Sequence, residues 1–555
     1  MTPLLDWISR PCGERGIHFA QGQDEWEYWS YPRLAVAALR TAGSLARNGV
    51  APGDNVLLVH PNGPGFVAAF FGALALGATP SPVAVPAAFG NKESYVDHLV
   101  RAAELSSSRV IVTSPELTDE LSHHARAAGC QLFVPDLEDS PADPMTPQFP
   151  EIALVQFSSG TTGSPKGIRL TYSALESNVL SILRWLGTGP EDSLATWLPL
   201  HHDMGLVGCL LAPVAAQVDV WMMRPDHFVR DPGRWLRTIG RQGVTIAVSP
   251  NFALDLVVRR VKPRMVTGLD LTRWRALVVG SERIQPATVR KFLELVTPLG
   301  FASGSFLPAY GLAEASLAVT GTGPGRSFST VHPDWDSMRT GQPVTLLEDA
   351  ADEQGLVGAG RPLPGMGVTI IGTDAEPLPE GTLGEIAVTG NSVTRSLLTK
   401  EGLVTWEPDE ALHTGDAGFL LNGELFVIGR LGDGVKLRGT WVFAEPLEEL
   451  VKKHAARPHH TTVLLGHLSG EPVAAVAVEN GRPQELAALG HRLSEAVPGL
   501  RVLACAVRAG WIRRTTSGKP RRSQMWQELT TLVPSGFVSW DSRTAALVAA
   551  ADEAQ

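Results

Sequence analysis

Between Phe157 and Gly167 the chain gathers residue types that suit a bound triphosphate. The stretch holds three glycines, five hydroxyl side chains and one lysine, and it follows the apolar run Ala153–Val155. Glycine lets backbone N–H groups approach an anion closely, and hydroxyls and a lysine add donors and positive charge. We therefore predict a phosphate-binding loop that leaves a strand end. Its candidate residues are Ser158, Ser159, Gly160, Thr161, Thr162, Gly163 and Lys166.

This stretch differs from the P-loop pattern GxxxxGK[ST]. Counted from Gly160, Pro165 stands where the second glycine belongs and Gly167 where Ser or Thr belongs. A flexible surface loop has a similar composition. The lysine and glycine placed after a strand favour phosphate binding over that alternative.

The elements that would position this loop alternate between strands and helices. Short apolar runs between turn signals predict buried strands, and helical stretches lie between them. Strands that alternate with helices favour parallel α/β layers. The apolar run Phe66–Ala78 is too short to cross a membrane and reads as a buried helix. The predicted strands are Val56–Val59, Val110–Val112, Leu132–Val134, Ala153–Phe157, Thr245–Val248 and Ala276–Val279.

After about Arg361 the pattern changes. Gly and Pro recur, and the alternating runs Gly367–Ile371 and Glu385–Val388 predict a small antiparallel β unit. A short α+β segment follows Arg430. The Ala-rich, acidic end from Val533 onward predicts a loose tail or a surface helix.

Composition excludes several classes of protein. The 555 residues carry a net charge of −10, which argues against a nucleic-acid-binding surface. The four cysteines, Cys12, Cys130, Cys209 and Cys505, are scattered and predict neither a disulfide framework nor a zinc site. No secretory signal is visible at the N-terminus, so we expect a cytoplasmic protein.

Five motifs, in order along about residues 20–530, resemble those of the adenylate-forming superfamily, which includes acyl-CoA ligases and peptide-synthetase adenylation domains. The first is the phosphate loop. Ala309–Glu314 resembles the Tyr-Gly-x-Thr-Glu motif and Leu412–Asp416 the Thr-Gly-Asp motif. Ile428–Asp433 resembles the hinge motif and Thr516–Lys519 the C-terminal lysine motif. The resemblance implies an enzyme that uses ATP and Mg²⁺ to form an acyl-adenylate.

The resemblance also implies roles for individual residues. Tyr310 would offer a π face to adenine, Glu314 would hold Mg²⁺, and Asp416 and Arg430 would bind the ribose hydroxyls. Lys519 would carry the adenylation step, since a cation offsets the repulsion between a carboxylate and the α-phosphate. An ordinary half-buried Tyr, a Gly-Asp turn and a solvated basic turn are the plain alternatives. Further nucleotide-site candidates are Gly280, Ser281, Glu282, Ala309, Gly311, Leu312, Ala313 and Ile428.

Within the superfamily, the sequence most resembles the fatty acyl-AMP ligase branch, through Trp197–Gly205, Ser249–Ala253 and Gly280–Glu282. His202 is a candidate catalytic residue as a wall or gate of the acyl pocket, or it is a structural His beside Asp203. The nearby apolar residues Val207, Leu210 and Leu211 suit a lipophilic acyl group, although a buried helix has the same composition.

Val331–Val357 is a candidate for the insertion of this branch, which packs on the N-terminal domain and is associated with disfavouring CoA; a plain surface loop is the alternative. The sequence departs from the wider family pattern at three places. These are Ala313, Gly432 and the pair Thr440-Trp441, of which the last two lie where the resemblance implies that the C-terminal domain pivots and meets the acceptor.

The predicted fold class is α/β: a large N-terminal region of two α/β subdomains plus a small β-barrel-like unit, and a small mobile α+β C-terminal domain. We expect an N-terminal adenylation domain at 1–432, a C-terminal domain at 433–530 that carries Lys519, and a tail at 531–555. The expected acceptor is the phosphopantetheine thiol of a carrier protein. An acyl-CoA ligase is the near alternative. A non-catalytic homologue is disfavoured because Lys519 and Glu314 are both present.

Overall fold

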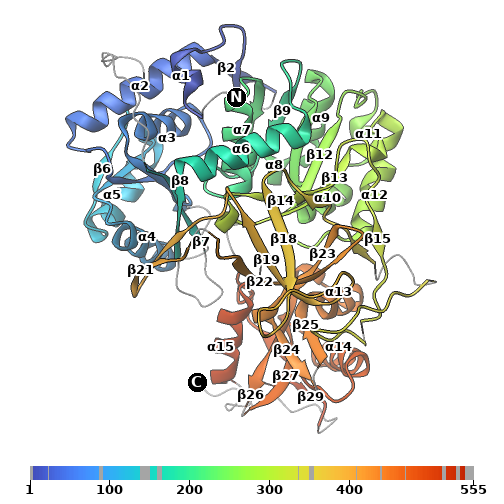
Figure 1. Cartoon of the computed structure of the whole chain (residues 1–555). Helices are drawn as coiled ribbons and strands as arrows, with labels where there is room; N and C mark the ends of the chain where they lie inside the picture. Colours follow the sequence, from blue (N-terminus) through green and yellow to red (C-terminus); the bar gives the residue numbers. More distant parts are fainter. Residues whose placement is uncertain are drawn as a thin grey trace.

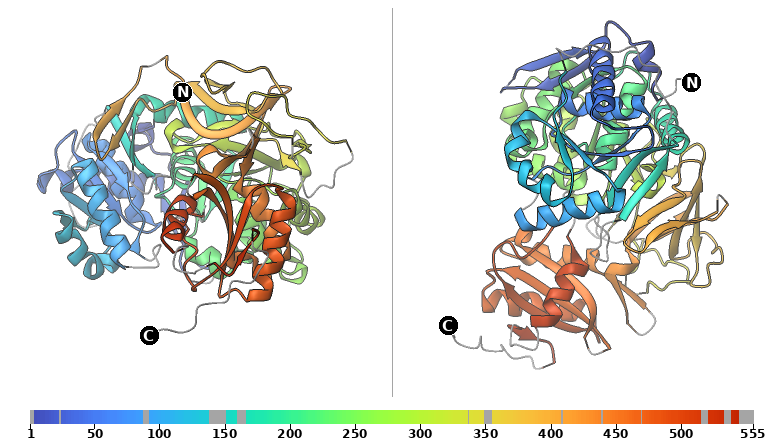
Figure 2. Two further views of the ribbon diagram at one scale, coloured as in Figure 1. Left: turned by 90° about the horizontal axis from the view of Figure 1, so that it is seen from below. Right: turned by 90° about the vertical axis from the view of Figure 1, so that its left-hand side faces the viewer.

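The computed structural model describes most of the chain. The described residues are 4–22, 24–86, 92–137, 151–158, 166–335, 337–348, 355–407, 409–437, 440–468, 470–514, 520–532 and 538–543. Figure 1 shows a large N-terminal region and a smaller unit that begins after β23, and Figure 2 shows that this unit projects from one end of the large region.

The first α/β subdomain is built on a parallel sheet of order β4-β3-β5-β6. Its strands are β3 (Asn55–Val59), β4 (Thr79–Pro82), β5 (Val110–Thr113) and β6 (Gln131–Phe133), and its helices are α2 (Tyr31–Arg47), α3 (Pro64–Leu76), α4 (Lys92–Ser106) and α5 (Thr118–Ala127). Nearly every residue of α3 is buried, and the helix ends at Gly77, whose φ of 83° suits glycine. The buried helix and the three strands predicted here are confirmed.

The second subdomain holds a nine-stranded sheet of order β17-β14-β13-β12-β11-β9-β10-β1-β2. The strands β1, β10, β9, β11, β12 and β13 run parallel, and β2, β14 and β17 are antiparallel additions at the two edges. The strands are β1 (Gly16–Ala20), β2 (Trp26–Ser30), β9 (Ser193–Thr196), β10 (Asp219–Met222), β11 (Ile246–Pro250), β12 (Ala276–Gly280), β13 (Phe306–Gly311), β14 (Ala318–Gly321) and β17 (Arg361–Pro362).

Helices pack on this sheet and position the site. They are α1 (Asp6–Ser9), α6 (Tyr172–Leu186), a π-helical segment η3 (Met204–Leu211), α7 (Ala212–Ala215), α8 (Pro225–Arg230), α9 (Pro232–Gln242), α10 (Asn251–Arg260), α11 (Pro263–Val266) and α12 (Pro286–Val296). Helix α6 begins where the Thr171 side chain accepts a hydrogen bond from the Ala174 amide and ends at the left-handed Gly187.

One strand prediction needs a correction. The run Ala153–Phe157 forms part of β7 (Ile152–Ser158), but β7 belongs to no parallel layer. It pairs antiparallel with β8 (Lys166–Thr171) in a sheet of order β21-β20-β8-β7, with β20 (Ser396–Thr399) and β21 (Gly402–Thr405). The chain returns directly to the neighbouring strand, so the phosphate-loop stretch joins two antiparallel strands.

The predicted antiparallel β unit is confirmed as a sheet of order β18-β19-β22-β23. Its strands are β18 (Met366–Ile371), β19 (Gly384–Gly390), β22 (Leu412–Leu421) and β23 (Glu424–Arg430). The two ends of the candidate insertion meet as β15 (Thr330–Val331) and β16 (Leu356–Val357). The described part of the insertion packs on this sheet, because Met338 is buried with Phe419 and Ile428.

The C-terminal unit follows the short helix η8 (Leu431–Asp433). A two-stranded ribbon, β24 (Gly434–Leu437) and β25 (Thr440–Phe443), leads into helix α13 (Ala444–His454). A sheet of order β26-β27-β28-β29 packs with α14 (Pro483–Ala496) and α15 (Arg522–Leu532). Its strands are β26 (Thr461–Leu468), β27 (Glu471–Glu479), β28 (Arg501–Val507) and β29 (Trp540–Asp541).

The segment predicted as a tail is partly structured. Residues 531–532 end α15, and β29 pairs with β28 at the sheet edge, where Trp540 is 2% exposed. This part of 531–555 therefore belongs to the C-terminal sheet.

Within the described residues, no helix combines the length and the apolar character that a bilayer crossing requires.

Candidate functional site

A cavity lies between α6, η3 and the nine-stranded sheet. One end is polar and is formed at the carboxyl ends of β12 and β13, where loops of α/β sheets commonly bind ligands. The remainder is apolar. The lining residues are Ile182, Trp185, Leu186, Asp203, Met204, Gly208, Ile246, Val248, Val278, Gly280, Ser281, Ala309, Tyr310, Gly311, Leu317 and Ala318.

The polar end is joined to the β unit through Tyr310. The Tyr310 hydroxyl donates to the Asp416 carboxylate at 2.7 Å, and Arg430 Nε lies 3.3 Å from the other Asp416 oxygen. Asp416 and Arg430 stand opposite each other on β22 and β23, so the ladder register fixes this pair. Burial raises the pKa of Tyr310 well above its usual value, and the Asp416 charge adds to the effect. The tyrosine therefore stays a hydrogen-bond donor at neutral pH.

Two backbone positions at this end depend on glycine or on an unusual conformation. A Cβ on Gly311 would lie 1.9 Å from the Leu317 carbonyl oxygen, so any side chain there would displace the strand. Ser281 has a φ of 71°, in the left-handed region that non-glycine residues rarely adopt. Such strain is typical of ligand-binding turns, and Ser281 lines the cavity.

Besides Asp416, the carboxylates of Glu314 and Asp203 belong to this region. Glu314 follows Tyr310 by four residues in a short helix at Ala313–Ala315, and Asp203 begins η3 by accepting from the Met204 amide at 2.7 Å. Burial raises the pKa of Glu314, the Asp203 and Asp416 charges raise it further, and Arg430 works against them. A hard cation would relieve this repulsion, and carboxylate oxygens are its preferred ligands.

The pair fits Mg²⁺ held mostly by substrate. The described residues contain no cluster of three or more His, Cys, Asp or Glu side chains suited to a metal. Mg²⁺ usually takes one or two carboxylates and completes its shell with phosphate and water, so two carboxylates suffice.

The phosphate-loop candidates are only partly described. Ser158 ends β7, and its backbone pairs with Lys166, which begins β8 and is exposed. Ser159, Gly160, Thr161, Thr162 and Gly163 lie outside the described residues, as does Lys519. For these residues the sequence predictions stand untested.

The remaining predicted nucleotide-site residues divide into two groups. Gly280, Ser281, Ala309, Tyr310 and Gly311 line the cavity. Glu282 accepts a hydrogen bond from the Phe252 amide beside it, and Leu312, Ala313 and Ile428 pack in apolar cores. Glu282, Leu312, Ala313 and Ile428 are therefore structural neighbours of the cavity and do not line it.

His202 stands beside the cavity and is not one of its lining residues. Its ring lies 4.5 Å, centroid to centroid, from that of His201, whose backbone oxygen accepts from Gln156 at 2.6 Å. Burial lowers the pKa of His201 well below its usual value, and His202 and His98 lower it further. His201 is therefore neutral at physiological pH. A gating role for His202 remains a prediction.

The acyl-pocket residues suggested by the sequence need a correction. Val207, Leu210 and Leu211 are fully buried in the main core and do not line the cavity. Within η3 the lining residues are Met204 and Gly208.

The apolar end also uses residues that the sequence analysis missed. Helix α6 contributes Ile182, Trp185 and Leu186, and β11 contributes Ile246 and Val248. The alternation of Ile246 and Val248 on one strand face was the available signal, but an apolar helix face gives no sign of whether it meets core or cavity.

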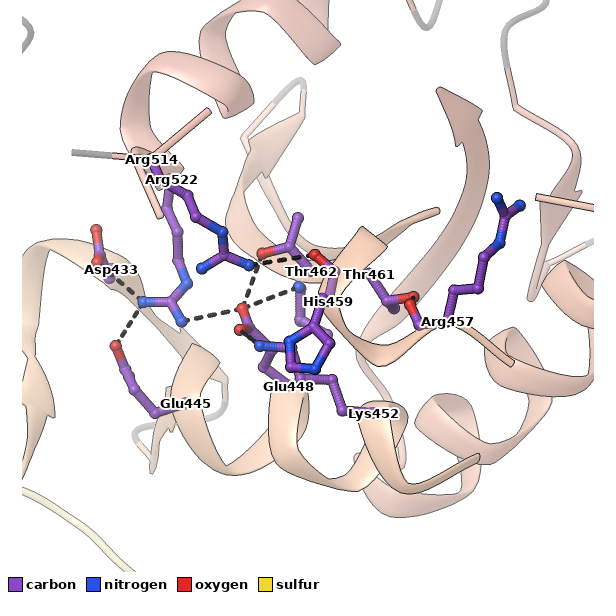
Figure 3. A network of polar contacts seen from close by, with 11 residues as sticks. Asp433, Glu445, Glu448, Lys452, Arg457, His459, Thr461, Thr462, Arg514 and Arg522 are labelled. Carbon is purple, nitrogen blue, oxygen red and sulfur yellow. Dashed lines mark hydrogen bonds and ion pairs between the residues drawn. The ribbon is translucent and has the colours of Figure 1, made fainter. Parts of the chain in front are cut away.

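A buried ionic network lies at the base of the C-terminal unit (Figure 3). Arg522, three positions after Lys519, contacts Glu445 at 2.6 Å, Glu448 at 3.0 Å and Asp433 at 3.4 Å. Glu448 is also paired with Lys452. Arg522 is therefore more than part of a solvated turn, since it ties the start of α15 to the predicted hinge residue Asp433.

The candidate insertion reaches both the site and this unit through Arg283, which follows Glu282. The Arg283 guanidinium lies 4.9 Å from the centre of the Trp335 ring and 3.8 Å from the carboxylate of Glu449 on α13. One side chain thus touches the nucleotide-side loop, the insertion and the C-terminal unit.

Comparisons with known proteins agree with this geometry. The family model for AMP-binding enzymes matches residues 7–398. A Caulobacter vibrioides protein described as an acyl-CoA synthetase is 30% identical, with 94% of both chains covered. A long-chain-fatty-acid–AMP ligase of Mycobacterium tuberculosis is 30% identical over 85% of this chain and 86% of that protein.

Solved structures give the same result. A structure from a study of fatty acyl-adenylate ligases from E. coli and L. pneumophila matches with a TM-score of 0.86 at 25% identity, covering 96% of this chain and 99% of that one. The L. pneumophila fatty acyl-adenylate ligase in complex with acyl adenylate and pyrophosphate matches with a TM-score of 0.71 at 26% identity, covering 95% and 96%.

The chain therefore belongs to the AMP-binding enzymes. The resemblance to adenylate-forming ligases, the predicted α/β fold class and the enzyme class are confirmed.

Proposed function

We propose that the protein uses ATP to activate a hydrophobic carboxylic acid as an acyl-adenylate and then passes the acyl group to a phosphopantetheine thiol. In the first step a carboxylate oxygen attacks the α-phosphorus of ATP. The bond from that phosphorus to the bridging oxygen breaks, and pyrophosphate leaves with the electron pair. In the second step the thiolate attacks the acyl carbon, and AMP leaves.

The observation that carries this proposal is the continuity of the cavity. Its apolar part and its polar end, with Ser281, Tyr310 and Gly311, form one space. An acid whose tail fills the apolar part presents its carboxylate to a nucleotide at the polar end. Such an arrangement brings two reactants into one orientation, which is a large part of catalysis in a two-substrate reaction.

Individual residues have defined tasks in this proposal. Asp416 and Arg430 hold the ribose, and Tyr310 lies against adenine while it donates to Asp416. Glu314 would hold Mg²⁺, and the ion would supply positive charge that neutralises the phosphates. Lys519 stabilises charge on the carboxylate and α-phosphate in the transition state. The C-terminal domain, 433–530, turns at Asp433 to bring Lys519 in and out of the site.

The acyl acceptor, the partners and the cellular location are supported by separate observations. The resemblance associates an insertion at this place with disfavouring CoA, and its described part packs on β22 and β23. The M. tuberculosis relative is named as a long-chain-fatty-acid–AMP ligase. We therefore propose an acyl carrier protein as the acceptor partner. The net charge of −10 supports the absence of a nucleic-acid partner, and the N-terminal sequence supports a cytoplasmic location.

The test is ATP–pyrophosphate exchange with a panel of carboxylic acids, with wild type beside Lys519→Ala, followed by addition of CoA or a holo-carrier protein. We expect exchange with apolar acids, loss of at least a hundredfold in the variant, and thioester only on the carrier. Full exchange activity in Lys519→Ala would overturn the role of the lysine.

An acyl-CoA ligase is the second candidate function. The 30% identity to a protein described as an acyl-CoA synthetase favours it. Robust acyl-CoA formation in the same assay would replace the carrier protein with CoA as the acceptor.

A further inference from the structure

Two short stretches of backbone on either side of Lys519 pair with each other. Arg514 and Pro520 form an antiparallel bridge between these stretches, which we call the incoming segment (511–514) and the return segment (520–522). Pro520 directly follows Lys519 in the chain. Because consecutive Cα atoms are about 3.8 Å apart, the place of the two segments limits where Lys519 can lie.

The incoming segment is held by a buried carboxylate at the end of β27. Glu479 Oε1 accepts a hydrogen bond from the Ile512 amide at 3.0 Å, and its Oε2 lies 2.7 Å from His460 Nδ1. The Glu479 side chain is 7% exposed. Burial alone would raise the pKa of Glu479, but hydrogen bonds from His460 and Ile512 outweigh it and lower the pKa. The carboxylate is therefore ionised at neutral pH and makes charge-assisted hydrogen bonds.

Other contacts hold the two segments in different ways. The return segment is held by Arg522 through the buried ionic network. On the incoming segment, Arg513 pairs with Glu528 at 3.2 Å with both side chains partly exposed, and the Arg513 amide lies 3.3 Å from the Met525 sulfur. An exposed ion pair contributes little and sulfur is a weak acceptor, so these contacts hold the backbone less firmly than the Glu479 carboxylate does.

We propose that Glu479 is a positioning residue for adenylation: it holds the incoming segment so that Lys519 can reach the carboxylate and the α-phosphate. Glu479 acts through the Ile512 backbone and does not itself touch substrate. The proposal rests on the proposed function, in which only the first step uses the lysine and transfer follows after the C-terminal domain has turned. A loosened incoming segment should therefore slow adenylation and spare transfer.

The test measures the two steps separately in Glu479→Leu, which cannot accept the hydrogen bond from Ile512. ATP–pyrophosphate exchange reports adenylation, with the acid that gives the fastest exchange in wild type. The reaction of the chemically prepared adenylate of that acid with CoA or a holo-acyl carrier protein reports transfer. We expect pyrophosphate exchange to fall about ten- to a hundredfold, since a displacement of about 1 Å at a catalytic group can cost that much. Transfer should be unchanged.

Two further variants distinguish positioning from a general loss of stability. Glu479→Gln keeps a side-chain oxygen that can accept from Ile512, so it should recover most of the pyrophosphate exchange. Asp541 is the matched control, because its carboxylate is 11% exposed and pairs with Arg501 at 2.7 Å on the edge strand β29. Asp541→Leu should leave pyrophosphate exchange unchanged. If Glu479→Leu and Asp541→Leu lose both steps to the same extent, Glu479 is only structural and the proposal is wrong.

A double variant tests whether Glu479 acts through the lysine. In a Lys519→Ala background, Glu479→Leu should cause no further loss of pyrophosphate exchange, because the side chain that it positions is already absent. A further loss as large as the one in the wild-type background would overturn the proposal.

Amide hydrogen exchange separates this inference from the proposed function, because it needs no substrate. We expect the amides of residues 510–514 to exchange faster in Glu479→Leu than in Asp541→Leu. If no acid supports pyrophosphate exchange in wild type, the adenylation proposal fails, and amide exchange alone decides whether Glu479 holds the incoming segment. If wild type is active and Glu479→Leu is equally active, adenylation stands and the inference is wrong.

Discussion

The acyl cavity and the ionic network of the C-terminal unit are built on opposite physical principles. Apart from its polar end, the cavity has apolar walls, and the indole N–H of one of them, Trp185, donates to a backbone carbonyl. The network buries one arginine, Arg522, among three carboxylates, with side chains 7–20% exposed. The cavity provides a volume that a ligand can fill, whereas the ionic network fixes the relative positions of its side chains.

The difference indicates what each region does. Contacts in an apolar cavity are weak singly and add with buried area, so they discriminate ligands gradually by size. A buried ion pair is costly to desolvate and strongly destabilising to break, so it behaves as a switch between intact and lost. The apolar cavity therefore suits the binding of an acyl chain. The ionic network suits a rigid connection next to the predicted hinge at Asp433.

The largest effect should follow from removing the central charge of the network. Arg522→Met keeps much of the side-chain volume but leaves Glu445 and Glu448 without their buried partner. We expect a loss of about 3–5 kcal/mol of stability in the C-terminal unit, measured by hydrogen exchange of the α13 and β26 amides. The matched control is Arg513→Met, because Arg513 pairs with Glu528 at 3.2 Å with its side chain 41% exposed. That variant should change stability by less than about 1 kcal/mol. Equal effects of the two would contradict the comparison.

Acid should weaken the network without affecting the cavity walls. Burial alone would raise the pKa of Glu448, but Arg522 and Lys452 outweigh it and lower the pKa from 4.5 to about 2. A depressed pKa means that the stabilisation is complete above about pH 4.5 and is lost as the pH falls to about 2. Burial and neighbouring Asp433 raise the pKa of Glu445, so its contribution has the opposite sign and lies at higher pH.

Hydrogen exchange of α13 between pH 4.5 and 2 measures this loss, which should flatten in Arg522→Met. An equally steep loss in that variant would show that another group controls the transition.

The smallest effect should come from a substitution of Tyr310, whose ring lines the cavity and whose hydroxyl bonds to a charged group. It lines the cavity and donates to Asp416 at 2.7 Å. Tyr310→Phe removes one hydrogen bond to a charged group, worth about 1.5–3 kcal/mol, so KM for ATP should rise about tenfold or more. The preference among acids of different length should not move, since the hydroxyl is bonded to Asp416 and not to the apolar walls of the cavity. A changed preference among acids in steady-state exchange assays would show that the Tyr310 hydroxyl also affects how the acid binds, and would contradict this prediction.

Several strands and part of the polar end of the cavity were predictable from sequence because local patterns control them. Apolar runs between turns predicted β3, β5 and β6 of the first parallel sheet and β11 and β12 of the nine-stranded sheet. Gly415-Asp416 and Gly429-Arg430 were recognisable, although their pairing across β22 and β23 was not. The pairing of β7 was predicted wrongly, since the run Ala153–Phe157 has the same composition in either kind of sheet.

The sequence by itself determined the class of chemistry, since the types and order of residues around Tyr310, Glu314 and Asp416 are local properties of the chain. Only the tertiary structure decided which apolar residues bound the cavity and which fill the core. Trp185 and Leu210 are both apolar helical residues, yet one lines the cavity and the other is fully buried. The tertiary structure also turned Arg522 from one of several basic residues into the centre of a network, because its three partners come from distant positions. The physical reason is the same in both cases: hydrophobic burial and charge pairing depend on which surfaces meet, and the sequence near a residue does not specify its distant neighbours.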